Sequence, residues 1–256
     1  MEKTNTMKIV LAFAVICIFY MFIVFLFNFF KEEEFSGYII NSNLGGFYCQ
    51  NTDCEWVGIE DINSSSTSFE IYQRNKSLGI YQLEYASKWN FYQQNEWQGI
   101  YGDFLAISNS LKYEVLPYQI ENLTDEDYNS IRELIEDFSS SSTSLNNDFA
   151  YVLDLDQNGV QDRILAVSNQ TEEETGSEYF SSLIVNLNGK IHMIYEENTL
   201  KSNGFSLPYY SFMEAIKIGE EVKMILNKSY FNNAGSPSTI LLSVSHNEIL
   251  EEAVGQ

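Results

Sequence analysis

The sequence contains few of the residues that mark linkers, zinc clusters and nucleic-acid surfaces. Three prolines among 256 residues argue against a long extended linker or stalk. A zinc cluster needs four ligands, and only two histidines, His192 and His246, accompany the cysteines. Basic residues number 14 against 36 acidic ones, and the resulting net charge of −22 repels phosphate backbones. We therefore expect no nucleic-acid partner.

The sequence also lacks the motifs of the common enzyme classes. It contains no GxSxG, HExxH, Walker or GxGxxG pattern, so no residue receives a catalytic assignment. The acidic residues could include the carboxylate pair of a glycosidase, but a sequence does not show which two face each other. Five aromatic residues could line a carbohydrate groove, although aromatic residues at strand spacing lie more often in a core: Tyr81, Trp89, Tyr92, Trp97 and Tyr101.

One long apolar run stands near the N-terminus. Ile9–Phe30 contains one polar residue, Asn28, and at about 1.5 Å of rise per residue it can cross a hydrocarbon core of about 30 Å. The run is longer than the apolar part of a signal peptide, and no small-x-small cleavage site follows it. It predicts an uncleaved transmembrane helix at 9–30. Lys3 and Lys8 precede the run, which predicts a cytoplasmic tail at 1–8 and a C-terminal domain outside the cell membrane.

Two cysteines, Cys49 and Cys54, follow the apolar run. Outside the cytoplasm such thiols tend to pair, so we expect one short disulfide loop. Closing so small a ring is worth about 2 kcal/mol in the chain-entropy model. The bond would be a structural staple and not a functional site.

The remaining chain has the patterns of antiparallel strands. A polar turn at 74–77 divides residues 69–85 into two apolar halves, which is typical of a hairpin. Asn188-Gly189 lies between two alternating segments and supplies the two positive φ values of a type I′ turn. Further strands are expected at 99–108 and 112–120, and hairpins at 183–195, 214–226 and 239–252.

One amphipathic helix is expected near 125–138. Thr124 is a good N-cap, and three acidic residues follow it in the first turn, where the helix dipole favours them. An apolar stripe then recurs at helical spacing, which predicts that the helix packs against a sheet. The members of the stripe are Tyr128, Ile131, Leu134, Ile135 and Phe138.

The strands after this helix form a degenerate repeat. The segment "VLDLDQNGVQDRILAVSN" with "SSLIVNLNGKI" corresponds to "AIKIGEEVKMILNKSYFN" with "STILLSVSHNEI". The fold class is therefore mainly β (α+β): an N-terminal transmembrane helix, then antiparallel sheets with one helix and two related β-meanders. We expect a β-rich subdomain at 35–122 that carries the Cys49–Cys54 loop. Residues 123–256 would hold the helix and the duplicated meander.

The segment "LDLDQNGVQDRIL" concentrates acidic side chains in one short loop. Asp154, Asp156, Asn158 and Asp162 occupy positions 1, 3, 5 and 9 of a D-x-D-x-N-G-x-x-D pattern. Calcium prefers six to eight oxygen ligands, and alternate residues of a tightly curled loop point inward. Gly159 would permit the sharp turn, so that the carbonyl of Val160 also faces the metal. The other interpretation is a polar turn between two strands, because Asn-Gly is itself a hairpin signal.

This loop resembles two known kinds of calcium loop. Its first nine positions are similar to an EF-hand loop, but Leu165 stands where that family has a bidentate glutamate. The flanking strands make 149–168 resemble the calcium hairpins of integrin-type FG-GAP repeats. The resemblance implies structural Ca²⁺ held by Asp154, Asp156, Asn158, Asp162 and the Val160 carbonyl. Without the glutamate we expect weak affinity, with a dissociation constant of about 10⁻⁴–10⁻³ M.

These features favour a single-pass, membrane-anchored extracytoplasmic binding or scaffolding domain, braced by calcium and a disulfide. Its partners would be the membrane, through 9–30, and an extracytoplasmic protein or glycan. The alternative is an anchored extracytoplasmic hydrolase acting on glycan or peptide, whose carboxylate pair is unidentified. Two close carboxylates with raised pKa values in one pocket would favour the enzyme.

Overall fold

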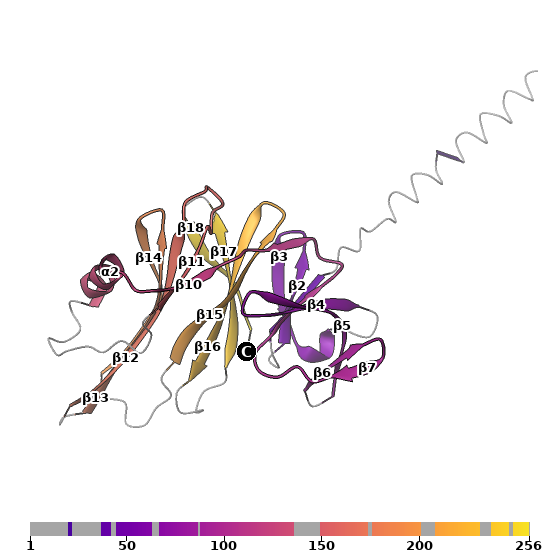
Figure 1. Ribbon diagram of the computed structural model, residues 1–256, viewed down its shortest axis with the longest axis horizontal. Coiled ribbons are helices and arrows are strands. Elements are labelled where there is room, and N and C mark those ends of the chain that lie inside the picture. Colours follow the sequence, from indigo (N-terminus) through magenta and orange to yellow (C-terminus); the bar gives the residue numbers. More distant parts are fainter. Residues whose placement is uncertain are drawn as a thin grey trace, which may run out of the picture. The chain divides into compact units, whose positions relative to one another are not determined.

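The chain forms two compact units, Met1–Phe35 and Ser36–Gln256, and the second unit contains the β-structure. The structure is a computed structural model (Figure 1), and its secondary structure is almost entirely antiparallel strands. It describes residues 20–21, 37–41, 45–62, 67–86, 88–135, 149–173, 176–200, 208–230, 237–245 and 248–255.

The first sheet has eight strands in the order β3-β2-β1-β8-β4-β5-β6-β7. Its turns use left-handed residues as expected for tight hairpins: Arg74 and Asn75 have φ values of 49° and 59° between β4 and β5. A short 3₁₀ helix, Ile59–Asp61, follows β3. The strands are β1 Gly37–Asn41, β2 Gly45–Gln50, β3 Asp53–Val57, β4 Ser68–Gln73, β5 Lys76–Tyr85, β6 Trp89–Gln93, β7 Glu96–Gln98 and β8 Leu105–Ser108.

The second and third sheets share one topology, because each is a four-stranded meander with a short strand added beside its first strand. The second sheet has the order β10-β11-β12-β13-β14, and the third β9-β15-β16-β17-β18. Both meanders that the sequence predicts are therefore present. The strands are β9 Tyr113–Val115, β10 Gln119–Asn122, β11 Phe149–Leu153, β12 Asp162–Glu173, β13 Gly176–Leu187, β14 Lys190–Leu200, β15 Pro208–Ile218, β16 Glu221–Tyr230, β17 Ser238–Ser245 and β18 Glu248–Gly255.

The two meander sheets share one core. Leu153 and Val185 of the second sheet belong to the same buried cluster as Phe212, Met224 and Leu242 of the third. Alternate residues of β13, β16 and β17 belong to this cluster, which is the period-two pattern that the sequence predicts. The strands β9 and β10 precede residue 123, yet they complete these two sheets by pairing with β15 and β11.

The helix α2, Asp125–Ile135, covers the other face of the second sheet (Figure 1), where Ile131 packs in one cluster with Val152 and Val167. Thr124 caps it as predicted: the Asp127 backbone N–H donates to Thr124 Oγ1 at 3.2 Å, and the Thr124 N–H donates to the Asp127 carboxylate at 2.7 Å. Arg163 of β12 forms a 2.8 Å ion pair with Asp127, whose side chain is 2 % exposed. The predicted positions 136–138 lie outside the described residues.

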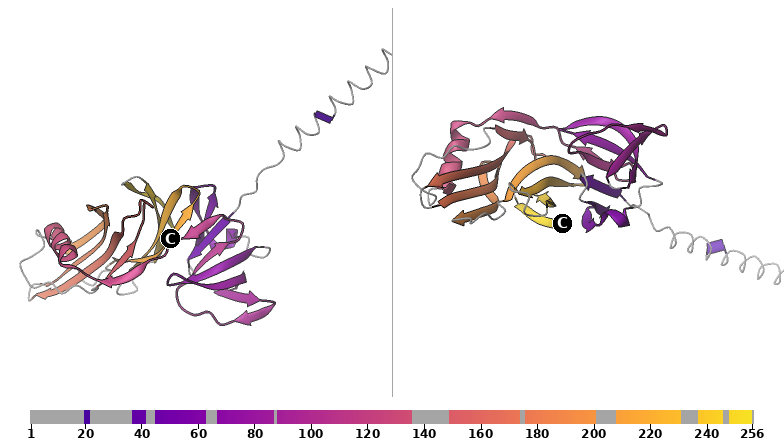
Figure 2. Two further views of the ribbon diagram at one scale, coloured as in Figure 1. Left: turned by 45° about the horizontal axis from the view of Figure 1, so that its top comes forward. Right: turned by 90° about the horizontal axis from the view of Figure 1, so that it is seen from below.

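Strands β3 of the first sheet and β18 of the third sheet lie next to each other (Figure 2), and specific side-chain contacts join the two sheets. Trp56 of β3 lies directly on Gly255 of β18, where an added Cβ would stand 1.9 Å from the indole ring. The Asn41 amide donates to Thr239 Oγ1 at 3.1 Å, and both residues are fully buried. These contacts cover the second face of the third sheet, which therefore has buried side chains on both sides.

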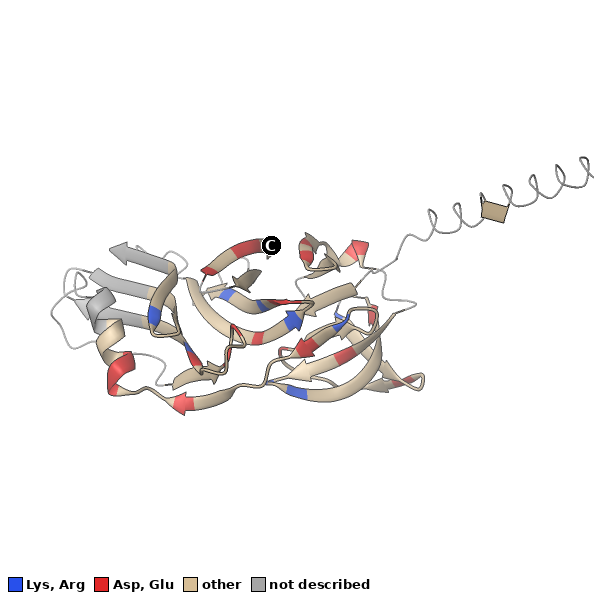
Figure 3. Cartoon of the chain, turned by 90° about the horizontal axis from the view of Figure 1, so that it is seen from above, with Lys and Arg blue, Asp and Glu red and all other residues tan. Residues whose placement is uncertain are grey.

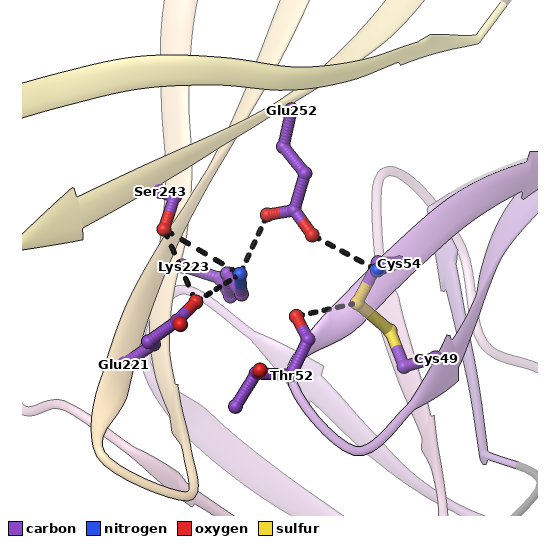
Figure 4. Close-up of a disulfide and its surroundings, with 7 residues drawn as sticks. All are labelled: Cys49, Thr52, Cys54, Glu221, Lys223, Ser243 and Glu252. Carbon is purple, nitrogen blue, oxygen red and sulfur yellow. Dashed lines mark hydrogen bonds and ion pairs between the residues drawn. A yellow bond between two sulfur atoms is a disulfide. The ribbon is translucent and has the colours of Figure 1, made fainter.

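The predicted Cys49–Cys54 disulfide is present and links directly opposed residues of β2 and β3. Figure 4 shows that it lies beside an ion cluster of the third sheet, formed by Lys223, Glu221 and Glu252. The Cys54 backbone N–H donates to Glu252 at 2.9 Å, and the other oxygen of Glu252 pairs with Lys223 at 2.6 Å. Glu221 also pairs with Lys223, at 2.7 Å. The disulfide hairpin is thus hydrogen-bonded to Glu252 of β18, and the ion pair of Glu252 with the buried Lys223 extends this link to β16.

The predicted transmembrane helix is not supported. Among the described residues, no helix is long and apolar enough to cross a membrane. The described helix α2 is too short and too polar for this: its 11 residues span about 16 Å, roughly half of a hydrocarbon core, and include five charged side chains. Within the predicted span 9–30, only Tyr20 and Met21 are described; the rest of it and the predicted tail at 1–8 lie outside the described residues.

Acidic residues are distributed over the strands and turns of the described part, with fewer basic residues between them (Figure 3). Most of them therefore need no individual explanation, because a charged surface keeps a protein soluble and separate from its copies. The informative acidic side chains are those that the fold brings together or buries.

Candidate metal centre

The loop between β11 and β12 curls as the sequence predicts. Gly159 has a φ of 87°, a left-handed conformation that glycine adopts without strain. Gln157 is also left-handed, at 57°. Asp154 accepts hydrogen bonds from the backbone N–H groups of Asn158, at 3.0 Å, and Gly159, at 2.8 Å. The side chain at position 1 thus fixes the turn that follows it.

The curled loop brings three carboxylates together. One oxygen each of Asp154, Asp156 and Asp162 lies within 4.8 Å of the other two. Oxygens around Ca²⁺ stand about 2.3–2.6 Å from the ion and therefore up to about 5 Å from one another. The spacing fits a cation between the three side chains. Without a cation the three negative charges repel one another.

Asp162 is the buried member of this carboxylate cluster, with 1 % of its surface exposed. Its two oxygens accept backbone N–H groups of Leu155, at 2.8 Å, and Asn188, at 2.9 Å. Burial raises the pKa of Asp162; the two N–H groups oppose this shift, and the charges of Asp154 and Asp156 add to it. A divalent cation would remove the repulsion and favour the charged form.

The structure adds one residue that the sequence interpretation missed. Asn188, in the turn between β13 and β14, donates from its side-chain amide to Asp156 at 2.6 Å and contacts the amide of Asn158. The predicted meander contains a signal for this contact, because alternate turns of an antiparallel meander lie at the same end of the sheet. The turns after β11 and β13 are therefore neighbours, and an amide in one can reach carboxylates in the other.

The two remaining predicted ligands have different positions. Asn158 is exposed, and its side-chain oxygen accepts the backbone N–H of Val160 at 2.7 Å. Rotation of an amide by half a turn exchanges its oxygen and nitrogen, so Asn158 and Asn188 can each present an oxygen to a cation. The Val160 side chain is 53 % exposed. Its carbonyl as a ligand stays a prediction.

A cavity of about 800 Å³ opens beside the loop. Asp156, Asn158 and Asn188 line it together with Glu220 and Ser245 from the third sheet. Lys217 of β15 donates to the side chain of Gln157, which ties the loop to the third sheet. The cavity gives water molecules access to the carboxylates, and water completes the coordination shell of many calcium sites.

The described carboxyl groups give no catalytic pair. Two of them have raised pKa values, Asp162 and Glu214. Asp162 belongs to the loop above, whereas Glu214 accepts the backbone N–H of Asn75 at 3.1 Å. In the part of the chain that the structure describes, these two residues lie on different sheets, Asp162 at the start of β12 and Glu214 on β15.

In comparisons with known proteins, no protein-family model matches the chain, and no curated protein or solved structure matches it. The resemblance of 149–168 to calcium hairpins therefore stays a prediction that rests on the loop alone.

Proposed function

We propose that residues 36–256 form an extracytoplasmic binding or scaffolding domain that is stabilised by a structural calcium ion in the loop between β11 and β12. The observation that carries the proposal is the convergence of Asp154, Asp156 and Asp162 within 4.8 Å, with the Asn188 amide beside them. The ion would join two turns of the second sheet, because Asp162 already accepts the Asn188 backbone N–H. The ion would stabilise this end of the sheet and take no part in a chemical reaction.

Two further features support a location outside the cytoplasm. The Cys49–Cys54 disulfide is of a kind that persists in oxidising compartments. A calcium site without a bidentate glutamate has the affinity of extracellular modules, whose dissociation constants of about 10⁻⁴–10⁻³ M suit media rich in free calcium. Both features are structural, so the domain would bind its ligand at another part of its surface.

Calcium should raise the melting temperature of the full chain by about 3–6 °C when its concentration is about ten times the dissociation constant, since binding to the folded state alone then adds about 1.4 kcal/mol. Thermal unfolding followed by circular dichroism, in calcium and in chelator, measures the shift. Asp156→Ala should abolish it. Magnesium should give a smaller shift, because it demands a tighter octahedral shell.

Glu84→Ala is the matched control for this experiment, because it removes one exposed carboxylate from β5 and should leave the calcium shift intact. Equal melting temperatures of the unmodified chain in calcium and chelator would remove the metal from the proposal. An unchanged calcium shift in Asp156→Ala would place the ion elsewhere.

Asn188→Gly should lower the calcium affinity about tenfold, as expected for a group that positions or completes a metal shell. Glycine suits this test, because Asn188 has a φ of 55° and an alanine there would strain the turn. Asn95→Gly is the control, since Asn95 has a φ of 65° in the turn between β6 and β7. Calcium titration by calorimetry compares the two; equal affinities would exclude Asn188 from the site.

A further inference from the structure

The end of the first sheet at β6 and β7 exposes two aromatic rings. Trp97 is 54 % exposed and Tyr101 is 75 % exposed, the highest value for a large apolar side chain in the described part of the chain. The two rings lie side by side over Gly99, because an added Cβ there would stand 3.0 Å from the Tyr101 ring and 3.4 Å from the Trp97 ring. Adjacent exposed rings form an apolar patch that is costly to hydrate, which makes this end of the sheet a candidate binding surface.

These rings border a cavity of about 170 Å³. Its lining also includes Trp89, Phe91 and Phe104, which are at most 4 % exposed and belong to the core of the first sheet. The rings of Phe91 and Phe104 pack edge to face, with 4.9 Å between their centroids. The site therefore has an aromatic floor fixed by core packing and an aromatic wall open to solvent.

The loop that carries Tyr101 is held in place from a neighbouring strand. Gln73 of β4 donates from its side-chain amide to the carbonyl oxygens of Tyr101, at 2.9 Å, and Asp103, at 3.1 Å. Both hydrogen bonds fix the backbone and leave the tyrosine ring uncovered. The loop backbone is therefore preorganised for a ligand, which reduces the conformational entropy lost on binding.

The size and polarity of this cavity limit its occupant. Its volume is below the range of about 300–1,000 Å³ for drug-sized ligands, so it suits a single ring. Aromatic faces attract the C–H groups of a sugar ring, and the lining residues Lys88 and Gln98 can donate to its hydroxyl groups. Lys88 has no ion-pair partner among the described side chains, and its charge would repel a cationic ligand that the rings alone would attract.

We infer that this cavity binds one pyranose ring of a neutral glycan, with the ring stacked on Trp97 and Tyr101. The inference rests on the proposed function in one respect, because it names the ligand class of the binding domain. A proline-rich peptide also stacks on aromatic residues, but it needs an extended groove for several residues. The single-ring volume therefore favours the sugar.

Fluorescence and calorimetric titration of the full chain with cellotetraose, chitotetraose and mannotetraose tests the site. At least one of them should bind with a dissociation constant on the order of 1 mM, which is typical of one exposed stacking site. Trp97→Ala and Tyr101→Ala should each weaken binding about tenfold, whereas Tyr101→Phe, which keeps the ring, should retain the affinity. Tyr128→Ala, an exposed ring on α2, should leave binding unchanged.

Absence of saturable binding for all three sugars would overturn the inference, and so would an unchanged affinity in both alanine variants with native circular dichroism. Saturation by a proline-rich decapeptide or by choline, with no response to the sugars, would overturn it as well. The calcium-dependent melt is measured separately on the same samples. A preserved calcium shift without sugar binding would contradict the glycan site alone.

Discussion

Glu214→Gln should stabilise the protein strongly at alkaline pH and hardly at all near pH 5. Glu214 lies at a bulge of β15, is 2 % exposed, and has one carboxylate oxygen without a hydrogen-bond partner among the described residues. Burial raises its pKa to about 8, although the backbone N–H groups of Asn75 and Ala215 lower it in part. The charged form of this side chain is therefore costly in the folded state.

The direction of the effect follows from the two pKa values. In the unfolded chain Glu214 ionises near its ordinary value of 4.5, whereas the folded chain keeps the proton up to about pH 8. Between these values the folded state binds more protons than the unfolded state, so stability falls as the pH rises. The total loss is on the order of 5 kcal/mol above pH 8. Glutamine cannot ionise, and its side-chain oxygen can still accept the Asn75 N–H.

Urea unfolding of the Glu214→Gln variant and of the unmodified protein at pH 5, 7 and 9 measures the difference in their free energies of unfolding. Asp162 also has a raised pKa and shifts stability in the same direction, so only the difference between the two pH profiles reports Glu214. Glu84→Gln, at an exposed position of β5, should leave the profile unchanged. Parallel profiles for Glu214→Gln and the unmodified chain would show that Glu214 is already ionised in the folded state at neutral pH.

The local features of this fold follow from the sequence because their causes are local. Alternating side chains predict the meanders, and Asn188 and Gly189, with φ values of 55° and 79°, form the turn that their residue types favour. The cap at Thr124 is predicted for the same reason. Each of these features depends on a few neighbouring residues, so a short stretch of chain contains the information.

Long-range pairing is where the sequence interpretation falls short. The strand expected at 99–108 begins only at Leu105, because the preceding residues form the loop that carries Tyr101. The segment at 112–120 divides into β9 and β10, which add to the edges of two different sheets. The partner of an edge strand depends on the packing of distant elements, and alternation within the strand does not record it.

The candidate site shows the same division between local and distant contacts. The spacing of Asp154, Asp156 and Asp162 predicts their convergence, which the fold realises within one loop. The contact of Asn188 with Asp156 joins two turns, and these two residues are 32 positions apart in the sequence. The turn between β13 and β14 is by itself a sufficient reason for an asparagine at position 188, so the residue type does not reveal the contact. Only the order of the turns in the predicted meander indicates this second role.

Lys223 is the clearest case of a residue whose environment the sequence conceals. It alternates with Val222 and Met224 on β16, which predicts a side chain directed to solvent. The structure buries it to 1 % exposure, because the first sheet covers that face of the third sheet through contacts such as Cys54 to Glu252. Its ammonium group pairs with Glu221 and Glu252 and lies near Ser243 Oγ at 3.5 Å (Figure 4).

Lys223→Ala should lower the free energy of unfolding by about 3–5 kcal/mol, because it leaves the largely buried Glu252 without its counter-charge and opens a cavity. Urea unfolding measures the loss, and Lys112→Ala, at an exposed position, should change stability by less than about 0.5 kcal/mol. The pair Lys223→Met with Glu252→Gln keeps the volume and removes both charges, so it should recover most of the stability. If the double variant were as unstable as the sum of its single variants, the ion pair would carry no coupling energy, and the link between the disulfide hairpin and β16 would rest on packing alone.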